Sequence, residues 1–450
     1  MLPRPVATHA LLVCAALGWA GAFVACNRDT DLGAGRGAGA DGASGVDAGG
    51  GITVTTVAPQ LTAAAPAAAS ATWAAYQLDD GPWQALAPAA TGTYAFAVPA
   101  ARWALALACA SEDGALTTVF IHRRTAATHD LEATLEDQCT PPPPAAEFAL
   151  TGTISNLPAA TQWLDFAYAR DTRGGVLPVT AGRASYEEVG IAPGSWDFGF
   201  GMRDDSFGAL TRIALLRATP VTGDRALDVD AAGATSFVPG SKRLVLRGLD
   251  PSDTVTPRIL YAAGGPQGID VGPQDVPVGE QDVTLAYATV PEGAQLAGDR
   301  YHGILTAERD RREAHRAIDF RIHQAIDLDV ALLPIAGKPV VTVVASAPQV
   351  RLATRFAALP QAERYEVRAV AALNRRTQHA WHAIYDAAAA PGTEIVDTLP
   401  DLSALPGWRS EWALPVGVTA TVTVTSFEAK RALGDGTMQR ATGSAMDVTP

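Results

Sequence analysis

Apolar and polar residues alternate along most of the chain beyond its N-terminal region, which is the pattern of half-buried β-strands. The stretch 315–334, HRAIDFRIHQAIDLDVALLP, places Ile318 and Phe320 on one face and Asp319 on the other. The stretch 415–428, PVGVTATVTVTSFE, alternates valine with threonine in the same way. Because a slip of one residue would turn every side chain to the opposite face, the alternation also fixes the strand register. The pattern predicts an all-β chain.

Two segments, which begin with GTYAFAV and ASYEEVG, share the same order of landmark residues. In each, a tryptophan opens an alternating strand, an acidic pair and a Gly-Ala-Leu-Thr turn follow, and an arginine ends a second strand. Trp103 precedes Arg124 by 21 residues, and Trp196 precedes Arg217 by the same 21 residues. We therefore interpret the chain as repeated units of about 95 residues.

Units of this length with short alternating strands and frequent turns are typical of antiparallel β-sandwiches. In pattern and spacing they resemble the fibronectin type III-like and carboxypeptidase-regulatory-like sandwiches of bacterial surface lipoproteins. The resemblance implies immunoglobulin- or fibronectin-like tandem domains that serve mainly as spacers and binding modules. The predicted sandwich domains span 52–140, 146–240, 241–336 and 337–450.

The first 25 residues have the parts of a secretory signal peptide. Arg4 supplies the positive charge, an apolar stretch follows, and small residues precede Cys26. The stretch FVAC that ends at Cys26 resembles a bacterial lipobox, although a phenylalanine stands where leucine is usual. We predict a lipoprotein signal peptide at 1–25 and lipidation of Cys26. The alternative is an ordinary signal peptide that leaves Cys26 free.

The segment that follows, 26–51, is rich in glycine and nearly free of large side chains, so it cannot bury a core. We expect a flexible linker between a lipid anchor and the folded part. The predicted partner is therefore a bacterial membrane, reached after export. The outer membrane is favoured because Asn27 is not the aspartate that commonly signals retention in the inner membrane.

Charge and cysteine content narrow the class of protein further. The 450-residue chain has a formal net charge of −13, which argues against a nucleic-acid partner. Cys109 and Cys139 remain after the predicted signal peptide and Cys26 are set aside. An even pair in an exported protein predicts a disulfide between them. Two buried free thiols are the alternative.

The sequence contains no nucleophile elbow, P-loop or dinucleotide-binding fingerprint. His379 and His382 would point to opposite faces of a strand, so we expect ordinary roles for them rather than a metal site. Three acidic pairs are Asp204 with Asp205, Asp228 with Asp230, and Asp327 with Asp329. Their oxygens suit Ca²⁺, but none has the spacing of an EF-hand, so we expect solvated carboxylates beside strands. We predict no catalytic residue, no metal and no cofactor, and a protein that is not an enzyme.

One aromatic cluster favours a binding hypothesis. It consists of Trp381, Tyr385, Trp408 and Trp412, all in the last predicted domain. Sugar rings stack on exposed aromatic faces, but each sandwich also needs aromatic residues in its core. The predicted function is a non-catalytic cell-envelope lipoprotein that acts as a structural stalk or docking scaffold, with an envelope protein as its expected partner. The alternative is a surface glycan- or peptide-binding lipoprotein that uses this aromatic-rich unit, taken to be the one farthest from the anchor.

Overall fold

The computed structural model describes residues 51–57, 71–111, 115–135, 148–168, 171–176, 182–191, 193–205, 208–263, 268–273, 276–277, 279–309, 313–374, 376–390 and 392–450. The predicted signal peptide, the lipidation site Cys26 and the glycine-rich linker lie outside these ranges. Within them, regular structure is β-strand apart from three single turns of 3-10 helix. The 3-10 turns are Glu292–Ala294, Ala387–Ala389 and Ser410–Trp412. The predicted all-β class is confirmed.

The first group of strands, unit 1, is a sandwich of a small sheet, β4-β1-β7, against β2, β3, β5 and β6. Its strands are β1 (Gly51–Val57), β2 (Trp73–Leu78), β3 (Gln84–Ala85), β4 (Thr93–Ala97), β5 (Arg102–Ala110), β6 (Leu116–Thr125) and β7 (Asp130–Thr134). Alternate residues of β5, such as Trp103 and Leu105, pack in its core with Ile52 and Tyr94 of the small sheet. The alternation in the sequence therefore corresponds to burial between two layers.

Unit 2 packs a small sheet, β11-β8-β14 with β15 also on β8, against the sheet β10-β9-β12-β13-β16. Its strands are β8 (Phe148–Ser155), β9 (Trp163–Tyr168), β10 (Asp171–Val176), β11 (Ala184–Ile191), β12 (Gly194–Arg203), β13 (Leu210–Val221), β14 (Arg225–Ala226), β15 (Val229–Asp230) and β16 (Ser236–Phe237). Its core is rich in phenylalanine: the rings of Phe166 and Phe198 stack with centroids 5.8 Å apart.

Unit 3 packs a small sheet, β20-β17-β23, against β19-β18-β21-β22. Its strands are β17 (Gly240–Arg247), β18 (Thr254–Ala262), β19 (Ile269–Asp270), β20 (Asp282–Thr289), β21 (Arg300–Arg309), β22 (Ala314–Ile322) and β23 (Leu328–Ala331). Ile318 and Phe320 of β22 are buried in the core. Asp319 lies on the opposite face, where its carboxylate is 3.3 Å from the imidazole of His302.

Unit 4 packs a small sheet, β24-β25-β28, against strands β26, β27, β29 and β31. Its strands are β24 (Val340–Ala345), β25 (Arg351–Ala357), β26 (Ala362–Ala372), β27 (Gln378–Asp386), β28 (Glu394–Thr398), β29 (Ala420–Glu428), β30 (Arg431–Leu433) and β31 (Gly436–Val448). In units 1 to 3 the first strand lies in the middle of the small sheet and pairs in parallel with strands near the end of its unit: β1 with β7, β8 with β14 and β15, and β17 with β23. Unit 4 departs from this shared topology, because its small sheet is antiparallel throughout.

The larger sheets of units 3, 4 and 1 join edge to edge into one 13-stranded sheet. Between units 3 and 4, β22 pairs antiparallel with β31 from Ala314 to Arg321. Between units 4 and 1, β27 pairs in parallel with β6 from Gln378 to Tyr385. We call the second junction the β6–β27 seam. Hydrogen bonds of one sheet therefore run through three of the four units.

Both strands of the seam are buried on both faces. On β6, Phe120 points into the core of unit 1, whereas Val119 and Ile121 point into the core of unit 4 beside Trp381. Such burial is typical of parallel strands that are covered on both sides. Units 1 and 4 thus share one core, and the predicted domain boundaries stay predictions.

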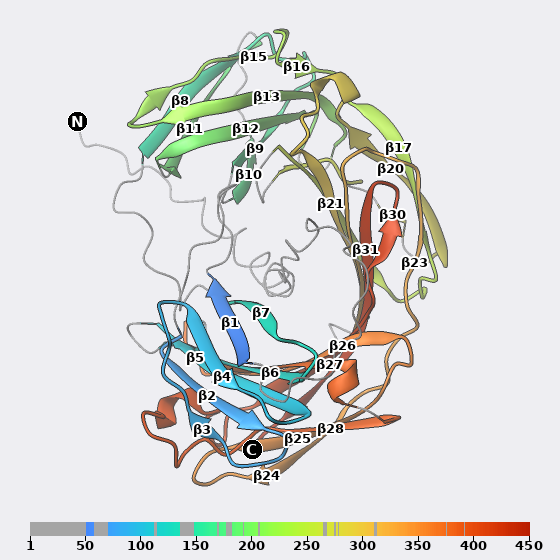
Figure 1. Ribbon diagram of the computed structural model, residues 1–450. Helices are drawn as coiled ribbons and strands as arrows, with labels where there is room; N and C mark the ends of the chain where they lie inside the picture. Colours follow the sequence, from blue (N-terminus) through green and yellow to red (C-terminus); the bar gives the residue numbers. More distant parts are fainter. Residues whose placement is uncertain are drawn as a thin grey trace, which may run out of the picture.

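The four units lie along an arc in the order 2, 3, 4, 1 (Figure 1). Unit 2, in green, occupies the top of the view, unit 3 the right side, and units 4 and 1 lie together at the bottom. The last unit therefore lies against the first folded unit after the predicted linker. This corrects the expectation that the last unit is the farthest from the N-terminal anchor.

The shared core makes a prediction for Ile121→Ala. Removing this buried side chain should lower the free energy of unfolding by about 2 to 5 kcal/mol through lost burial and a residual cavity. Because Ile121 lies in the core of unit 4, amide hydrogen exchange should speed up in β27 and β28 as well as in β6. The control is Ile154→Ala, which makes the same deletion in the separate core of unit 2 and should leave β27 unchanged. Acceleration confined to unit 1 in Ile121→Ala would contradict a shared core.

Candidate functional site

The two arginines that mark the sequence repeat both contact another unit. Arg124 follows the seam on β6 and places Nη1 2.6 Å from Oδ1 of Asp386 in unit 4. Arg217 on β13 of unit 2 places Nη2 2.6 Å from Oδ2 of Asp299 in unit 3. We call these two ion pairs the arginine clamps. Equivalent positions of the repeat thus bind each unit to its neighbour.

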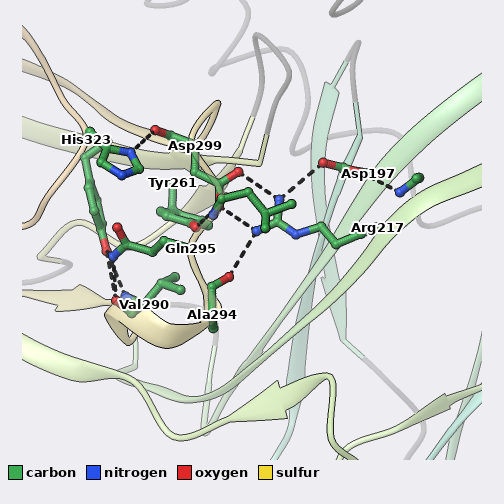
Figure 2. Close-up of polar contacts among 11 residues, drawn as sticks. Asp197, Arg217, Tyr261, Val290, Ala294, Gln295, Asp299 and His323 are labelled. Carbon is green, nitrogen blue, oxygen red and sulfur yellow. Dashed lines mark hydrogen bonds and ion pairs between the residues drawn. The ribbon is translucent and has the colours of Figure 1, made fainter.

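The Arg217 clamp joins several groups at the contact between units 2 and 3 (Figure 2). The two terminal nitrogens of Arg217 donate to both carboxylate oxygens of Asp299, at 2.9 and 2.6 Å. Arg217 also donates to the carbonyl of Ala294 at 3.3 Å and to the carboxylate of Asp197, within its own unit, at 3.2 Å. The hydroxyl of Tyr261 donates to the Asp299 carboxylate from the other side.

The side chains of the Arg217 clamp are largely shielded from solvent, which shifts the pKa values of Tyr261 and Arg217. The Asp299 side chain is 1% exposed and that of Arg217 is 21% exposed. Burial and the neighbouring Asp299 carboxylate raise the pKa of Tyr261, so its hydroxyl stays a donor. Burial alone would lower the pKa of Arg217, but its hydrogen bonds to Asp299 raise it overall. The clamp is therefore a structural contact in which both oxygens of Asp299 and both terminal nitrogens of Arg217 are hydrogen-bonded.

A second contact between units 2 and 3 lies at the end of β12. The Nε of Arg203 donates to Asp165 of its own unit at 2.8 Å, and one terminal nitrogen donates to the carbonyl of Asp270 in unit 3. On the same strand, a Cβ added to Gly199 would lie 2.7 Å from the Ile269 side chain. Only glycine lets β12 approach unit 3 this closely. The two contacts together fix the orientation of unit 2 on unit 3.

A groove of about 420 Å³ lies beside this contact, lined by Arg203, Leu210, Val271 and Tyr287 among others. Each of the three guanidinium nitrogens of Arg203 already donates to a protein oxygen. The Tyr287 hydroxyl donates to the carbonyl of Ile326. The described lining therefore does not define the chemistry of a ligand.

Two buried histidines, His122 on β6 and His382 on β27, lie at the β6–β27 seam. The Nε2 of His382 is 3.2 Å from a carboxylate oxygen of Glu366, and its ring lies beside Phe120. The Nδ1 atoms of His122 and His382 are buried without a hydrogen-bond partner. Burial, followed by the positive charges of Arg124 and nearby groups, lowers the pKa of His122 well below its ordinary value. Protonation of this imidazole therefore opposes the seam.

The structure also locates the histidines and acidic pairs that the sequence singled out. His379 contacts the Thr117 hydroxyl at 2.9 Å, on the face of β27 opposite to His382, as expected. The Asp228 carboxylate accepts the backbone N–H of Thr153 at 2.9 Å. Its pair partner Asp230 accepts from the side-chain amide of Asn156. In the pair at 327 and 329, Asp327 accepts the backbone N–H of Arg243 and Asp329 accepts from the Arg247 guanidinium. Within the described ranges, no group of three or more His, Cys, Asp or Glu could hold a metal ion.

Three of the four aromatic residues of the binding hypothesis are buried. Trp381, Tyr385 and Trp412 are 1%, 5% and 2% exposed, and Trp408 is partly buried. The Trp408 ring meets Trp412 edge-on at 5.4 Å and Trp73 of unit 1 at 5.2 Å. These rings fill the shared core of units 1 and 4, so the three buried ones offer no open face to a sugar. The structure favours the core alternative.

Of the three cysteines with a predicted role, one lies in the described residues. Cys109 is buried in the core of unit 1. Cys139 and the lipidation site Cys26 lie outside the described residues, so the disulfide and the lipid anchor stay predictions.

Comparison with known proteins identifies no family for this chain. No family model and no curated protein matches it. A solved structure of a streptococcal ancillary pilin aligns with 68% of this chain and 96% of the pilin chain, at 8% identity and a TM-score of 0.14. We infer nothing about fold or function from a similarity this low. No helix in the described ranges has the length and hydrophobicity needed to span a membrane.

The Arg217 clamp predicts the effect of Arg217→Met. Without the guanidinium, the Asp299 carboxylate would remain buried without its counter-ion, which should destabilise the contact of units 2 and 3 by about 3 kcal/mol. The measurement is chemical denaturation, with amide exchange of the segment 292–299 as the local readout. Adding Asp299→Asn should restore part of the loss, because it removes the unpaired charge.

Arg247→Met is the matched control for this variant. Arg247 makes a similar two-pronged pair with Asp329, but both side chains are about half exposed and lie within unit 3. Solvent screens such a pair, so this variant should behave like the wild type. Equal destabilisation by the two variants would contradict the assignment of Arg217 as a clamp.

The buried His122 predicts that the stability of the fold decreases in acid. Because the folded-state pKa of His122 lies below its unfolded value of about 6.5, the unfolded chain binds more protons as pH falls through that value. Folding stability should therefore decrease from neutral pH towards acid, and His122→Gln should reduce this slope. The measurement is the denaturation midpoint as a function of pH, with His129→Gln at an exposed position of unit 1 as the control variant. An unchanged slope in His122→Gln would refute the role of this imidazole.

Proposed function

We propose that the chain is a non-catalytic lipoprotein of the bacterial cell envelope that serves as a structural or docking scaffold. The observation that carries the scaffold role is the 13-stranded sheet that runs through units 3, 4 and 1. A string of independent sandwiches joined by linkers would reorient freely, because interfaces between such domains are small. Here the seam and the arginine clamps join the units into one body.

The polar groups of the unit contacts also support a structural role. In the Arg217 clamp the ionisable side chains hydrogen-bond to one another, because Arg217 and Tyr261 both donate to Asp299. At the other clamp, Arg124 and the hydroxyl of Thr128 both donate to Asp386. Catalytic acids and bases need a proton that moves near the working pH. We therefore assign these clusters to holding the arc together.

The envelope location rests on the N-terminal sequence. Cys26 ends the lipobox-like stretch, and the glycine-rich segment 26–51 would separate lipid from the folded units. A multiply acylated terminus binds a bilayer in an effectively permanent manner. The predicted disulfide between Cys109 and Cys139 could form in such an exported, oxidising environment.

Two measurements on the full chain, expressed with its N-terminal region in a bacterium, test this proposal. First, the wild type should incorporate a fatty-acid label and partition into detergent, whereas Cys26→Ser should do neither. Second, small-angle X-ray scattering of purified Cys26→Ser should fit the arc of Figure 1 as one body. A wild type without label would refute the anchor. A scattering curve that requires an ensemble of extended, freely jointed sandwiches would refute the scaffold.

A further inference from the structure

Exposed apolar side chains gather on the small sheet of unit 4. Of the eleven large hydrophobic residues that are exposed in the described part of the chain, four lie on these three strands. They are Val340, Val343, Val344 and Val396, with exposed fractions of 57%, 40%, 50% and 54%. Val340 and Val396 flank Arg355 in one row across the sheet, so they share its outer face. Val343 lies opposite the buried Leu352 and so is on the inner side of the sheet; we call Val340, Val344 and Val396 the valine patch.

The patch includes a free sheet edge. Among the described strands, β24 pairs with β25 alone, so its outward N–H and C=O groups have no ladder partner. Its sequence, VVTVVA, has no charge, no proline and four β-branched valines. Such an edge is a template for another strand unless charge or shape blocks it.

Most other sheet edges in the described ranges are short or carry charged residues. Both ends of the 13-stranded sheet are strands of only two residues, β3 and β19. Edge strands of the small sheets carry acidic residues, as in β7, β11, β20 and β23. Two further edges of units 1 to 3 carry no charge: β16 has only two residues, and the exposed residues of β4 are alanines. Of the edges described, β11 and β28 also expose a valine, but both carry acidic residues, so β24 alone combines exposed large apolar side chains with an edge free of charge.

We propose that β24 pairs antiparallel with β24 of a second copy of this chain about a two-fold axis. Pairing of a strand with itself is isologous, and an uncharged strand places no like charges opposite one another. The charges beside β24 also favour a second copy. The outer face of the sheet carries Arg351 and Arg355 against one acidic residue, Glu394, on a chain of net charge −13. A locally positive face lowers the repulsion between two chains that are acidic as a whole.

The size of the surface limits the strength of this contact. A six-residue strand and the three valines of the patch bury less than the roughly 1,200 Å² that stable interfaces need. Pairing should therefore be weak in dilute solution and increase with concentration. It goes beyond the proposed scaffold role and does not need the lipid anchor, so it is testable in Cys26→Ser protein.

The test is amide hydrogen exchange of the full chain carrying Cys26→Ser, measured from dilute to concentrated solution. Exchange in β24 should slow by about tenfold with concentration, while exchange in β29 stays constant and reports the fold. Val340→Lys introduces a charge at the edge and should abolish the concentration dependence. The matched control is Val189→Lys on β11, an edge strand that already carries two glutamates, at a valine that is 54% exposed. This control should behave like the parent protein.

Three results would overturn the proposal. Exchange in β24 that is independent of concentration would show that the edge stays free. Slowing in another edge strand instead of β24 would place the contact elsewhere. Equal loss of self-association in Val189→Lys and Val340→Lys would show non-specific attraction. None of these results bears on Cys26 or on the rigidity of the arc, so failure here is distinguishable from failure of the proposed function.

Discussion

The β6–β27 seam constrains the rest of the architecture, because parallel strands in the middle of a sheet must be covered on both faces. Unit 1 supplies one cover through its small sheet, and unit 4 supplies the other through its own core. Neither unit can leave without exposing a strand edge and two apolar surfaces, such as those of Ile121 and Trp381. Together with the pairing of β22 with β31 and the Arg217 clamp, this pairing sets the order of units along the arc, 2, 3, 4 and 1.

Apolar burial and the arginine clamps contribute differently to the contacts between units. Each large apolar side chain buried at the seam contributes about 1.5 to 3 kcal/mol. A buried ion pair gains little net free energy over an apolar contact, since both charges lose water, but it is costly to break by removing one partner. We therefore attribute stability to residues such as Val119 and Ile121, and the relative orientation of units to Arg124 and Arg217. At the second contact between units 2 and 3, Gly199 of β12 leaves room for Ile269, which a Cβ at this position would approach too closely.

The sequence predicted local structure well and long-range pairing poorly. Alternation correctly placed Ile318 and Phe320 in the core and Asp319 on the other face, because period-two burial is a local property. The Trp–Arg spacing marked the repeated hairpin but not the partners of its arginines, which lie 262 and 82 residues away. A signal for the seam was present: β6 and β27 lack a clear alternation and are buried almost throughout. The partner of such a strand depends on the packing of whole units, which no local pattern records.

Chain connectivity limits how far the row of units can open. Unit 1 ends at Leu135 and unit 2 begins at Phe148, although the two units are at opposite ends of the spatial order. The 13 residue steps between them span at most about 45 Å, even when fully extended. The eight strands of units 3 and 4 that lie between unit 2 and β6 would span roughly 40 Å in a flat sheet, so a straight row would use nearly all of this reach. The covalent connection from unit 1 to unit 2 and the seam from unit 1 to unit 4 therefore favour a row that bends back towards its start, as Figure 1 shows.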